Sequence, residues 1–456
     1  MSLKRAGLLI VGLFISFRLF TWALIGNCTA LAPDEQGYVD MFNYVQNPEG
    51  PRPALQWPNT PIVVLKILFL PASIFHSLGL SDLTAFRAQS LTLTLFVVFF
   101  LIKAVKVLGI RERFDSLSQS GRKKFVIFWL AAASTPTVII WSVLGLREAF
   151  LYFSLSLLFL SVANIFSKSE SNNYFWLIAF AISLVILGNT KFYIYVIILV
   201  SIFIVLILNF VNKANLVKQL SVLLITLSSL VPFTQQLSEI NLPQIRFSSF
   251  DFSFNFLDSP TTPRLPSTTY SELQSCVLNK TAGPSLHAAL VVMNKVAPDR
   301  IQKVVGQPAV DAPAATALRA DDSLRSTLNL LELPTGLFYF LFFPLSVISS
   351  GIFGVLGVIE IIFWLPLYAT FAVMLFRSRS KIRKDAFVCL LTVFTLIFTL
   401  FSALAEVNFG TAIRHRSLLL IPMLLLASYL WTEKKKKPAS VPMPGQQADG
   451  NEHPFS

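Results

Sequence analysis

The sequence predicts an all-α polytopic membrane protein with about ten transmembrane helices, external juxtamembrane helices and one large external insert. Two observations carry this prediction. Hydrophobic residues make up 54% of the 456 residues and charged residues only 13%, and the mean hydropathy is +0.66. Apolar runs of about 20 residues, the length needed to cross a bilayer, recur along the chain. This composition excludes an ordinary soluble globular protein.

The formal net charge of +13 has two readings. In a soluble protein it would favour a nucleic-acid partner. Here Lys and Arg gather in short loops between apolar runs, as the positive-inside rule expects of membrane proteins. The predicted partner is therefore the lipid bilayer and not nucleic acid. The three cysteines form no CxxC pair, so they predict neither a metal site nor a disulfide framework, and a bond between Cys28 and Cys276 on the external side is the minor alternative.

The predicted spans follow from the apolar runs. They cover residues 7–26, 84–103, 125–144, 149–166, 174–190, 192–211, 219–236, 353–376, 386–405 and 416–432. The first run follows basic residues as a signal peptide does, but Arg18 interrupts it and no small-residue cleavage site is clear. We therefore expect it to remain as the first transmembrane helix. Two further apolar stretches, 61–80 and 334–351, are ambiguous.

Charge in the loops predicts the side of the membrane. Loops rich in Lys and Arg are expected in the cytoplasm, and they cover 103–124, 212–218, 377–384 and the tail. All of them fall on one side only if 61–80 and 334–351 do not cross the membrane, which makes both stretches interfacial or re-entrant. Both termini are then cytoplasmic. The external segments are 27–60, 144–149, 189–192, 237–333 and 406–416.

The chain divides into four predicted regions. They are a transmembrane module at 1–236 whose first external loop is 27–82, an external insert at 237–333, a re-entrant segment with C-terminal helices at 334–432, and a disordered cytoplasmic tail at 433–456. The insert is rich in proline and too long for a plain connector. Within it, 285–304 and 314–330 read as amphipathic helices.

An acid pair, Asp34 and Glu35, lies in the first external loop within the motif "PDEQGY". A carboxylate just outside a membrane can act as a general base or bind a cation. The alternative is a solvated loop acid, which is the commoner case for an isolated pair. Trp57 and several prolines nearby predict an ordered loop.

Charged residues also lie between later spans. Arg147 and Glu148 lie between two apolar runs that are joined by a very short loop. Each charge costs about 2.5–3.5 kcal/mol at a bilayer centre, so both are expected at the interface or in a protein cavity. Lys191 is the single charge between its two spans. It either extends to the interface as Lys commonly does, or faces an anionic substrate.

The strongest local signal is the segment 402–419. It contains Glu406, Asn408, Arg414, His415 and Arg416. Three basic side chains in a row on the predicted external face run against the positive-inside trend, and an anionic ligand would offset them. The planar, permanently charged Arg side chain suits phosphate. The alternative is that Arg414 or Arg416 pairs with Glu406 or Glu148.

On these motifs the chain resembles the membrane glycosyltransferases of the GT-C fold, in the bacterial branch related to protein O-mannosyltransferases and lipid A aminoarabinose transferases. The matching features are "PDEQGY" at 33–38, "WPNTP" at 57–61, "SDLTAFRAQSL" at 81–91 with Arg87, and seven spans before a large insert. The segments "LPTGLFYFLFFPLS" at 333–346 and "FGTAIRHR" at 409–416 resemble a subgroup found with bacterial polysaccharide genes.

The resemblance implies a function. Asp34 would be the catalytic base, acting with a polyprenyl-phosphate sugar donor and a glycan, lipid or protein acceptor on the extracytoplasmic face of the bacterial inner membrane. The candidate phosphate ligands are Arg147, Lys191, Arg414 and Arg416, with Glu148, Glu406, Asn408 and His415 as further substrate contacts. Glu35 would orient the acceptor or bind a metal. A divalent metal ion is the one cofactor left open.

Three alternatives remain at this point. A polysaccharide polymerase or ligase would use the same face and leaving group on a lipid-linked oligosaccharide. A flippase for lipid-linked sugars would spread its charges through the spans and often carries inverted repeats, neither of which the sequence shows. A purely structural membrane protein would leave the charges between 406 and 416 unexplained.

Overall fold

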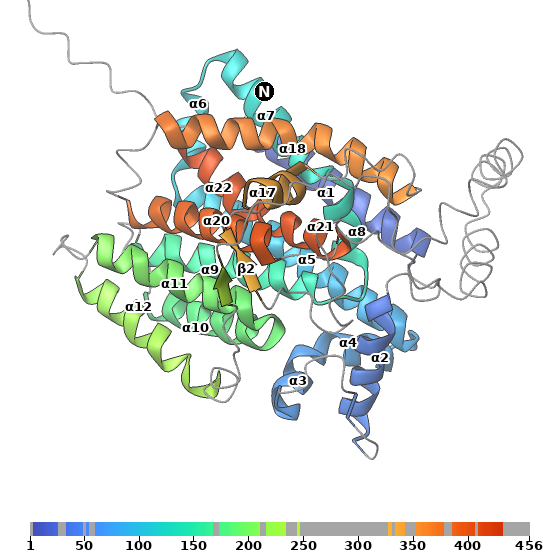
Figure 1. The fold of residues 1–456 in the computed structure, drawn as a ribbon. Helices are drawn as coiled ribbons and strands as arrows, with labels where there is room; N and C mark the ends of the chain where they lie inside the picture. The colour runs from blue at the N-terminus through green and yellow to red at the C-terminus, as the bar shows by residue number, and fades with distance from the viewer. Residues whose placement is uncertain are drawn as a thin grey trace, which may run out of the picture.

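The computed structural model describes residues 3–25, 33–48, 52–53, 60–166, 173–209, 216–233, 244–246, 327–330, 333–342, 352–377, 385–405 and 409–431. In these ranges the protein is helical (Figure 1), apart from two short parallel strands, β1 (Gln244–Arg246) and β2 (Thr327–Asn329). The helices are α1 (Leu3–Ile25), α2 (Pro33–Gln46), α3 (Ile62–Leu68), α4 (Leu70–Ser77), α5 (Asp82–Val107), α6 (Ile110–Asp115), α7 (Gln119–Ala133), α8 (Pro136–Val143), α9 (Glu148–Phe166), α10 (Asn173–Thr190), α11 (Phe192–Asn209), α12 (Leu216–Ser228), the 3-10 turn η2 (Val231–Phe233), α17 (Leu333–Phe342), α18 (Ile352–Arg377), α20 (Ala386–Ala405), α21 (Phe409–Leu418) and α22 (Leu420–Trp431).

Four of the described helices are long and apolar enough to cross a membrane, namely Arg5–Ala23, Asp82–Val107, Glu148–Phe166 and Ala386–Ala405. Shorter apolar helices cover Tyr174–Thr190, Phe192–Leu208, Val217–Phe233 and Glu360–Phe376. The chain is thus a helical protein with apolar helices suited to a lipid bilayer, as its composition predicts. The number of ten spans stays a prediction.

Three of the predicted spans are not continuous α-helices. In 219–236, α12 ends at Ser228, and a turn separates it from the 3-10 turn η2. The run 125–144 is divided between α7 and α8, because Pro136 begins a new helix after Thr135. The run 416–432 starts inside α21 and continues as α22 after a turn at Leu419. The ambiguous stretch 61–80 forms the short helices α3 and α4.

The core of the bundle forms around α9. This helix is apolar on all sides, and 89% of its membrane-length window is buried. A helix with this pattern belongs in the interior. It packs against α5, α10 and α20, and the largest hydrophobic cluster also takes in α11 and α22. Figure 1 shows α18 across the top of the view, α10–α12 at the lower left and α2–α4 as a separate group at the lower right.

The described contacts place the segments between helices in two groups, one at each end of the bundle. At one end the side chains of Arg113 and Asp385 both meet Tyr429, from elements far apart in sequence. At the other end Glu35 meets Gly145, and Thr60 donates a hydrogen bond to the carbonyl of Asn189 at 3.4 Å. Between these ends runs α9, whose 19 residues span about 28 Å at 1.5 Å per residue, close to a hydrocarbon core of about 30 Å.

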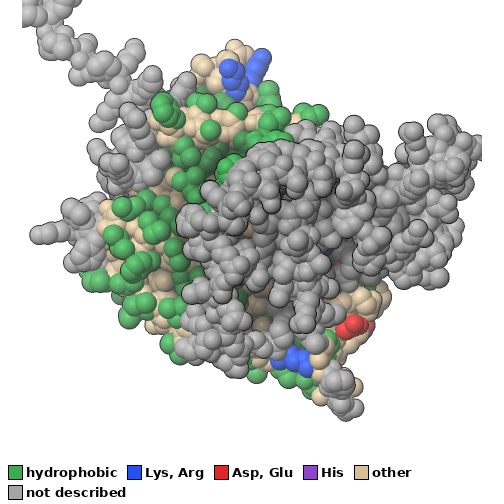
Figure 2. Space-filling view, in the orientation of Figure 1, with side chains coloured by type: hydrophobic (Ala, Val, Ile, Leu, Met, Phe, Trp, Pro, Cys, Tyr) green, Lys and Arg blue, Asp and Glu red, His purple; other side chains and the backbone are tan. Residues whose placement is uncertain are grey.

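The surface exposes many hydrophobic side chains, as expected of a protein surrounded by lipid. In Figure 2, hydrophobic side chains cover the left of the molecule over α11 and α12, and Lys and Arg gather at the tip formed by α6 and α7. The helices α3 and α4 have two apolar faces. The outer face exposes Val63, Ile67, Leu70, Ile74 and Leu78. The inner face buries Leu65, Leu68, Phe69 and Ala72 against α2 and α5. Such an outer face suits the interfacial position that the sequence predicts for 61–80.

The contact between α17 and α20 predicts one stability effect. A methyl group added at Gly336 would meet the carbonyl oxygen of Ala403 far inside contact distance. Because the obstacle is backbone, Gly336→Ala should lower the free energy of unfolding by about 1–3 kcal/mol, the usual cost of overpacking. The measurement is the thermal midpoint of the protein in detergent. Gly12→Ala in α1 is the control, since no atom lies within 4 Å of its added carbon. Equal midpoints for the two variants would contradict this packing.

Candidate functional site

A buried ion pair joins the first polar helix to the bundle. Arg87 of α5 donates from Nε to Glu35 Oε1 at 3.0 Å and from Nη2 to Oε2 at 2.8 Å. The backbone N–H of Gly145, in the turn before α9, donates to the same Oε1 at 2.8 Å. Both side chains are fully buried. This bidentate geometry is the strong form of an Arg–carboxylate contact, and it fixes α2, α5 and the start of α9 relative to one another.

The structure describes the side-chain contacts of Glu35 but only the backbone position of Asp34, the other acid of "PDEQGY". Both oxygens of Glu35 are engaged by Arg87 and Gly145, which suits an orienting role. Asp34 precedes Glu35 in α2, so its backbone lies at the same end of the bundle, and its side chain lies outside the described residues. The predicted contacts Glu406 and Asn408 also lie outside them.

Lys191 and His415 meet at this same end. Lys191 lies in the break between α10 and α11, and its Nζ contacts Nε2 of His415 in α21. The hydroxyl of Tyr193 lies 2.8 Å from Nε2 and 2.9 Å from Nδ1 of the same imidazole. His415 is fully buried and Lys191 is 7% exposed. A predicted cation and a predicted substrate contact, 224 residues apart in sequence, are thus direct neighbours.

Two arginines complete what we call the cation cluster, made of Arg147, Lys191, Arg414 and His415. The Arg414 guanidinium lies 4.6 Å from the ring centre of Trp141 in α8, which holds it by a cation–π contact. Burial lowers the pKa of His415 well below its ordinary 6.5, and the positive charges of Lys191, Arg147 and Arg414 lower it further. The imidazole is therefore neutral at neutral pH, and the positive charge of the cluster comes from the other three members.

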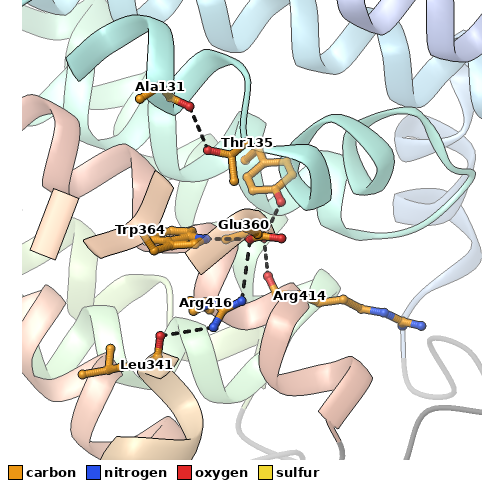
Figure 3. A network of polar contacts seen from close by, with 9 residues as sticks. Ala131, Thr135, Leu341, Glu360, Trp364, Arg414 and Arg416 are labelled. Atoms are coloured by element: carbon orange, nitrogen blue, oxygen red, sulfur yellow. Dashed lines mark hydrogen bonds and ion pairs between the residues drawn. The ribbon is translucent and has the colours of Figure 1, made fainter. Parts of the chain in front are cut away.

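Arg416 has a different place from Arg414. Its fully buried side chain points into the bundle, where Nη2 lies 3.7 Å from Glu360 Oε1 in α18 and Nη1 donates to the carbonyl of Leu341 at 3.2 Å (Figure 3). The sequence offered Glu406 or Glu148 as partners, and among described residues the acid beside Arg416 is Glu360. Arg416 remains a predicted phosphate ligand, but this geometry favours an anchoring role.

Glu148 begins α9 and is 1% exposed. Its negative charge is favourable at a helix N-terminus. In the described part of the chain its Oε2 has no hydrogen-bond partner. It acts electrostatically on Tyr152, one turn further along α9. Glu148 thus lies toward the interior of the bundle rather than within the cation cluster.

The sequence did not point to three residues that this site uses. Trp141 and Tyr193 are aromatic residues in apolar runs and carry no signal that separates them from lipid-facing neighbours. For Glu360 a sequence signal exists. It is the lone acid inside the apolar run 353–376, and an ionisable residue in such a run is a functional candidate by default.

Among the described residues, no group of three or more His, Cys, Asp and Glu side chains could hold a metal ion. A divalent ion at Glu35 would have to displace Arg87 from both carboxylate oxygens. Comparison with protein-family models, with curated proteins and with solved structures finds no match for this chain. Its function is therefore argued from the chemistry of the site.

The ion pair predicts a double-mutant cycle. Arg87→Met leaves the Glu35 carboxylate buried without its cation and should lower the free energy of unfolding by about 3–5 kcal/mol. Adding Glu35→Gln removes that unpaired charge, so the double variant should recover part of the loss. Thermal unfolding in detergent measures four proteins: the unaltered protein, Arg87→Met, Glu35→Gln and the double variant. Asp82→Asn is the control, because it breaks a contact with His76 that is half exposed, and its effect should be much smaller. Additive losses in the cycle would show that the two side chains do not interact.

Proposed function

We propose that this protein is a membrane glycosyltransferase that moves a sugar from a polyprenyl-phosphate donor to an acceptor hydroxyl. The observation that carries the proposal is the convergence of Arg147, from the turn before α9, and Lys191, from the break between α10 and α11, on α21, which contains Arg414 and the neutral His415. The helix that contains Asp34 and Glu35 is tied to the same end through Gly145. A cation group and an acid pair at one end of an apolar bundle suit a lipid-linked phosphate and a proton-accepting base.

The proposed topology places this end on the extracytoplasmic face of the bacterial inner membrane. It has ten spans in a GT-C-like arrangement, with both termini in the cytoplasm. Its support is that segments predicted to be external contact one another at one end of α9. Arg113 lies within the predicted cytoplasmic loop 103–124 and Asp385 directly follows the loop 377–384, and both meet Tyr429 at the other end. The product would be a cell-surface polysaccharide or glycoconjugate.

The cation cluster would hold the donor phosphate. As the glycosidic bond breaks, the bonding electrons move to the phosphate oxygen, and negative charge grows there. Cations already fixed in place stabilise this charge without reorganisation, which is the largest contribution in many enzymes. Lys191 contacts His415 and lies 5.3 Å from the ring centre of Tyr193, and Arg414 lies over Trp141. His415 stays neutral, so it orients Lys191 without adding to the mutual repulsion of the cations.

The two acids would have different roles. Asp34 takes the proton of the acceptor hydroxyl while that oxygen attacks the anomeric carbon, and the polyprenyl phosphate leaves from the opposite face with inversion. Glu35 is committed to Arg87, so it fixes the first turn of α2 and with it the position of Asp34. Cations beside Asp34 would favour its ionised form and would make it a weaker base. Positioning of the reactants must then supply most of the acceleration.

The test is sugar transfer in membranes supplied with lipid-linked donor. Asp34→Asn should lower turnover by about 10²–10⁴-fold, the usual contribution of a general base, with normal expression. The matched control is Asp40→Asn on the same helix, since Asp40 is exposed and bonded to Gln36 at 2.9 Å. Its turnover should match the unaltered protein. Retained turnover in Asp34→Asn would remove Asp34 from the role of base.

A further inference from the structure

A second polar group lies on the interior side of α21, and Glu360 is at its centre. The carboxylate is fully buried in α18, a helix that is otherwise strongly apolar. Its Oε1 accepts a hydrogen bond from the indole Nε1–H of Trp364 at 2.6 Å and lies 3.7 Å from Arg416 Nη2. Figure 3 shows Trp364 beside Glu360 and Arg416 below them, with Arg416 also reaching the carbonyl of Leu341.

Consecutive residues of α21 face two different groups. His415 belongs to the cation cluster, whereas Arg416 pairs with Glu360 and Ser417 Oγ lies 2.5 Å from the hydroxyl of Tyr152 in α9. Figure 3 shows the Arg414 side chain extending away from the Glu360–Arg416 pair. Any rotation or shift of α21 that moves Arg416 therefore also moves Arg414 and His415.

These polar contacts add to the packing of α21 against α8, α17 and α22. The helix has only 10 residues, FGTAIRHRSL, and few of them are large apolar side chains. Contacts of Arg416 with Glu360 and Leu341, and of Ser417 with Tyr152, therefore help to set its direction. Because Arg416 is buried, loss of its acid would leave a charge that must find another arrangement.

We propose that Glu360 is a positioning residue for the phosphate site. It holds Arg416, and through Arg416 it sets the orientation in which α21 presents Arg414 and His415 to the donor. This proposal rests on the proposed function for its ligand, a lipid-linked phosphate, but the effect on α21 itself does not depend on that function.

The experiment has two arms on the purified full-length protein in detergent. The first is hydrogen–deuterium exchange of residues 409–418, which reports the order of α21 whatever the protein does. The second is the affinity for farnesyl phosphate, a short prenyl phosphate used as the probe. Glu360→Gln should raise exchange in α21 and weaken binding by roughly tenfold, within the usual range for coupling between sites.

A matched control and a rescue separate positioning from general damage. Asp385→Asn removes an acid at the other end of the bundle that accepts a hydrogen bond from Tyr429 at 2.8 Å, and it should leave α21 exchange and binding unchanged. Charge reversal, Glu360→Arg with Arg416→Glu, should restore both readouts. If Glu360→Gln cannot be purified, Trp364→Phe removes the indole donor to Glu360 and weakens the cation–π contact with Arg416. It should move both readouts the same way by less.

The outcomes are distinct. Unchanged exchange and unchanged binding in Glu360→Gln, or equal effects of Asp385→Asn, would overturn the positioning role. Raised exchange with unchanged binding would overturn it too, because α21 would then move without consequence for the phosphate. If the unaltered protein does not bind farnesyl phosphate while Glu360→Gln loosens α21, the proposed function fails and the structural link between Glu360 and α21 stands.

Discussion

The buried contact between Glu35 and Arg87 is the interaction on which the site depends. Two charges without access to water are tolerated only when each satisfies the other, and here two hydrogen bonds at 3.0 and 2.8 Å do so. A third donor, the Gly145 N–H, brings the start of α9 to the same carboxylate. Glu35 thereby fixes α2, α5 and the turn before α9 relative to one another. The cation cluster lies beside these elements.

The same constraint organises the other buried charges. Lys191 lies against His415 and Tyr193, Arg414 lies over Trp141, and Arg416 lies beside Glu360. In an apolar bundle a charge that met no partner would be expelled or neutralised, so the location of these partners determines where charge can persist. That α21 contributes to both the cation cluster and the Glu360 group makes this short helix the mechanical link between the interior and the end of the bundle.

The sequence predicted a helical membrane protein, and it predicted that Arg147, Lys191, Arg414, His415 and Arg416 lie on one face. Both follow from quantities that a sequence contains: apolar run lengths and the distribution of Lys and Arg. It did not predict the partners of Glu35 and Arg416, because neighbours in space come from α5 and α18, and hydropathy does not specify which faces of two helices meet. The division of 125–144 was marked by Pro136, whose effect on a membrane span depends on the surrounding helices.

The most direct measurement is native mass spectrometry of the purified protein with farnesyl phosphate and, separately, with farnesol. The two lipids share the same apolar chain and differ in the phosphate alone. If the cation cluster binds a lipid-linked phosphate, the protein will retain farnesyl phosphate through detergent removal and will release farnesol. Equal retention of the two lipids, or retention of farnesyl phosphate that is unaffected when Lys191 and Arg414 are both replaced by Gln, would contradict a phosphate site at this cluster.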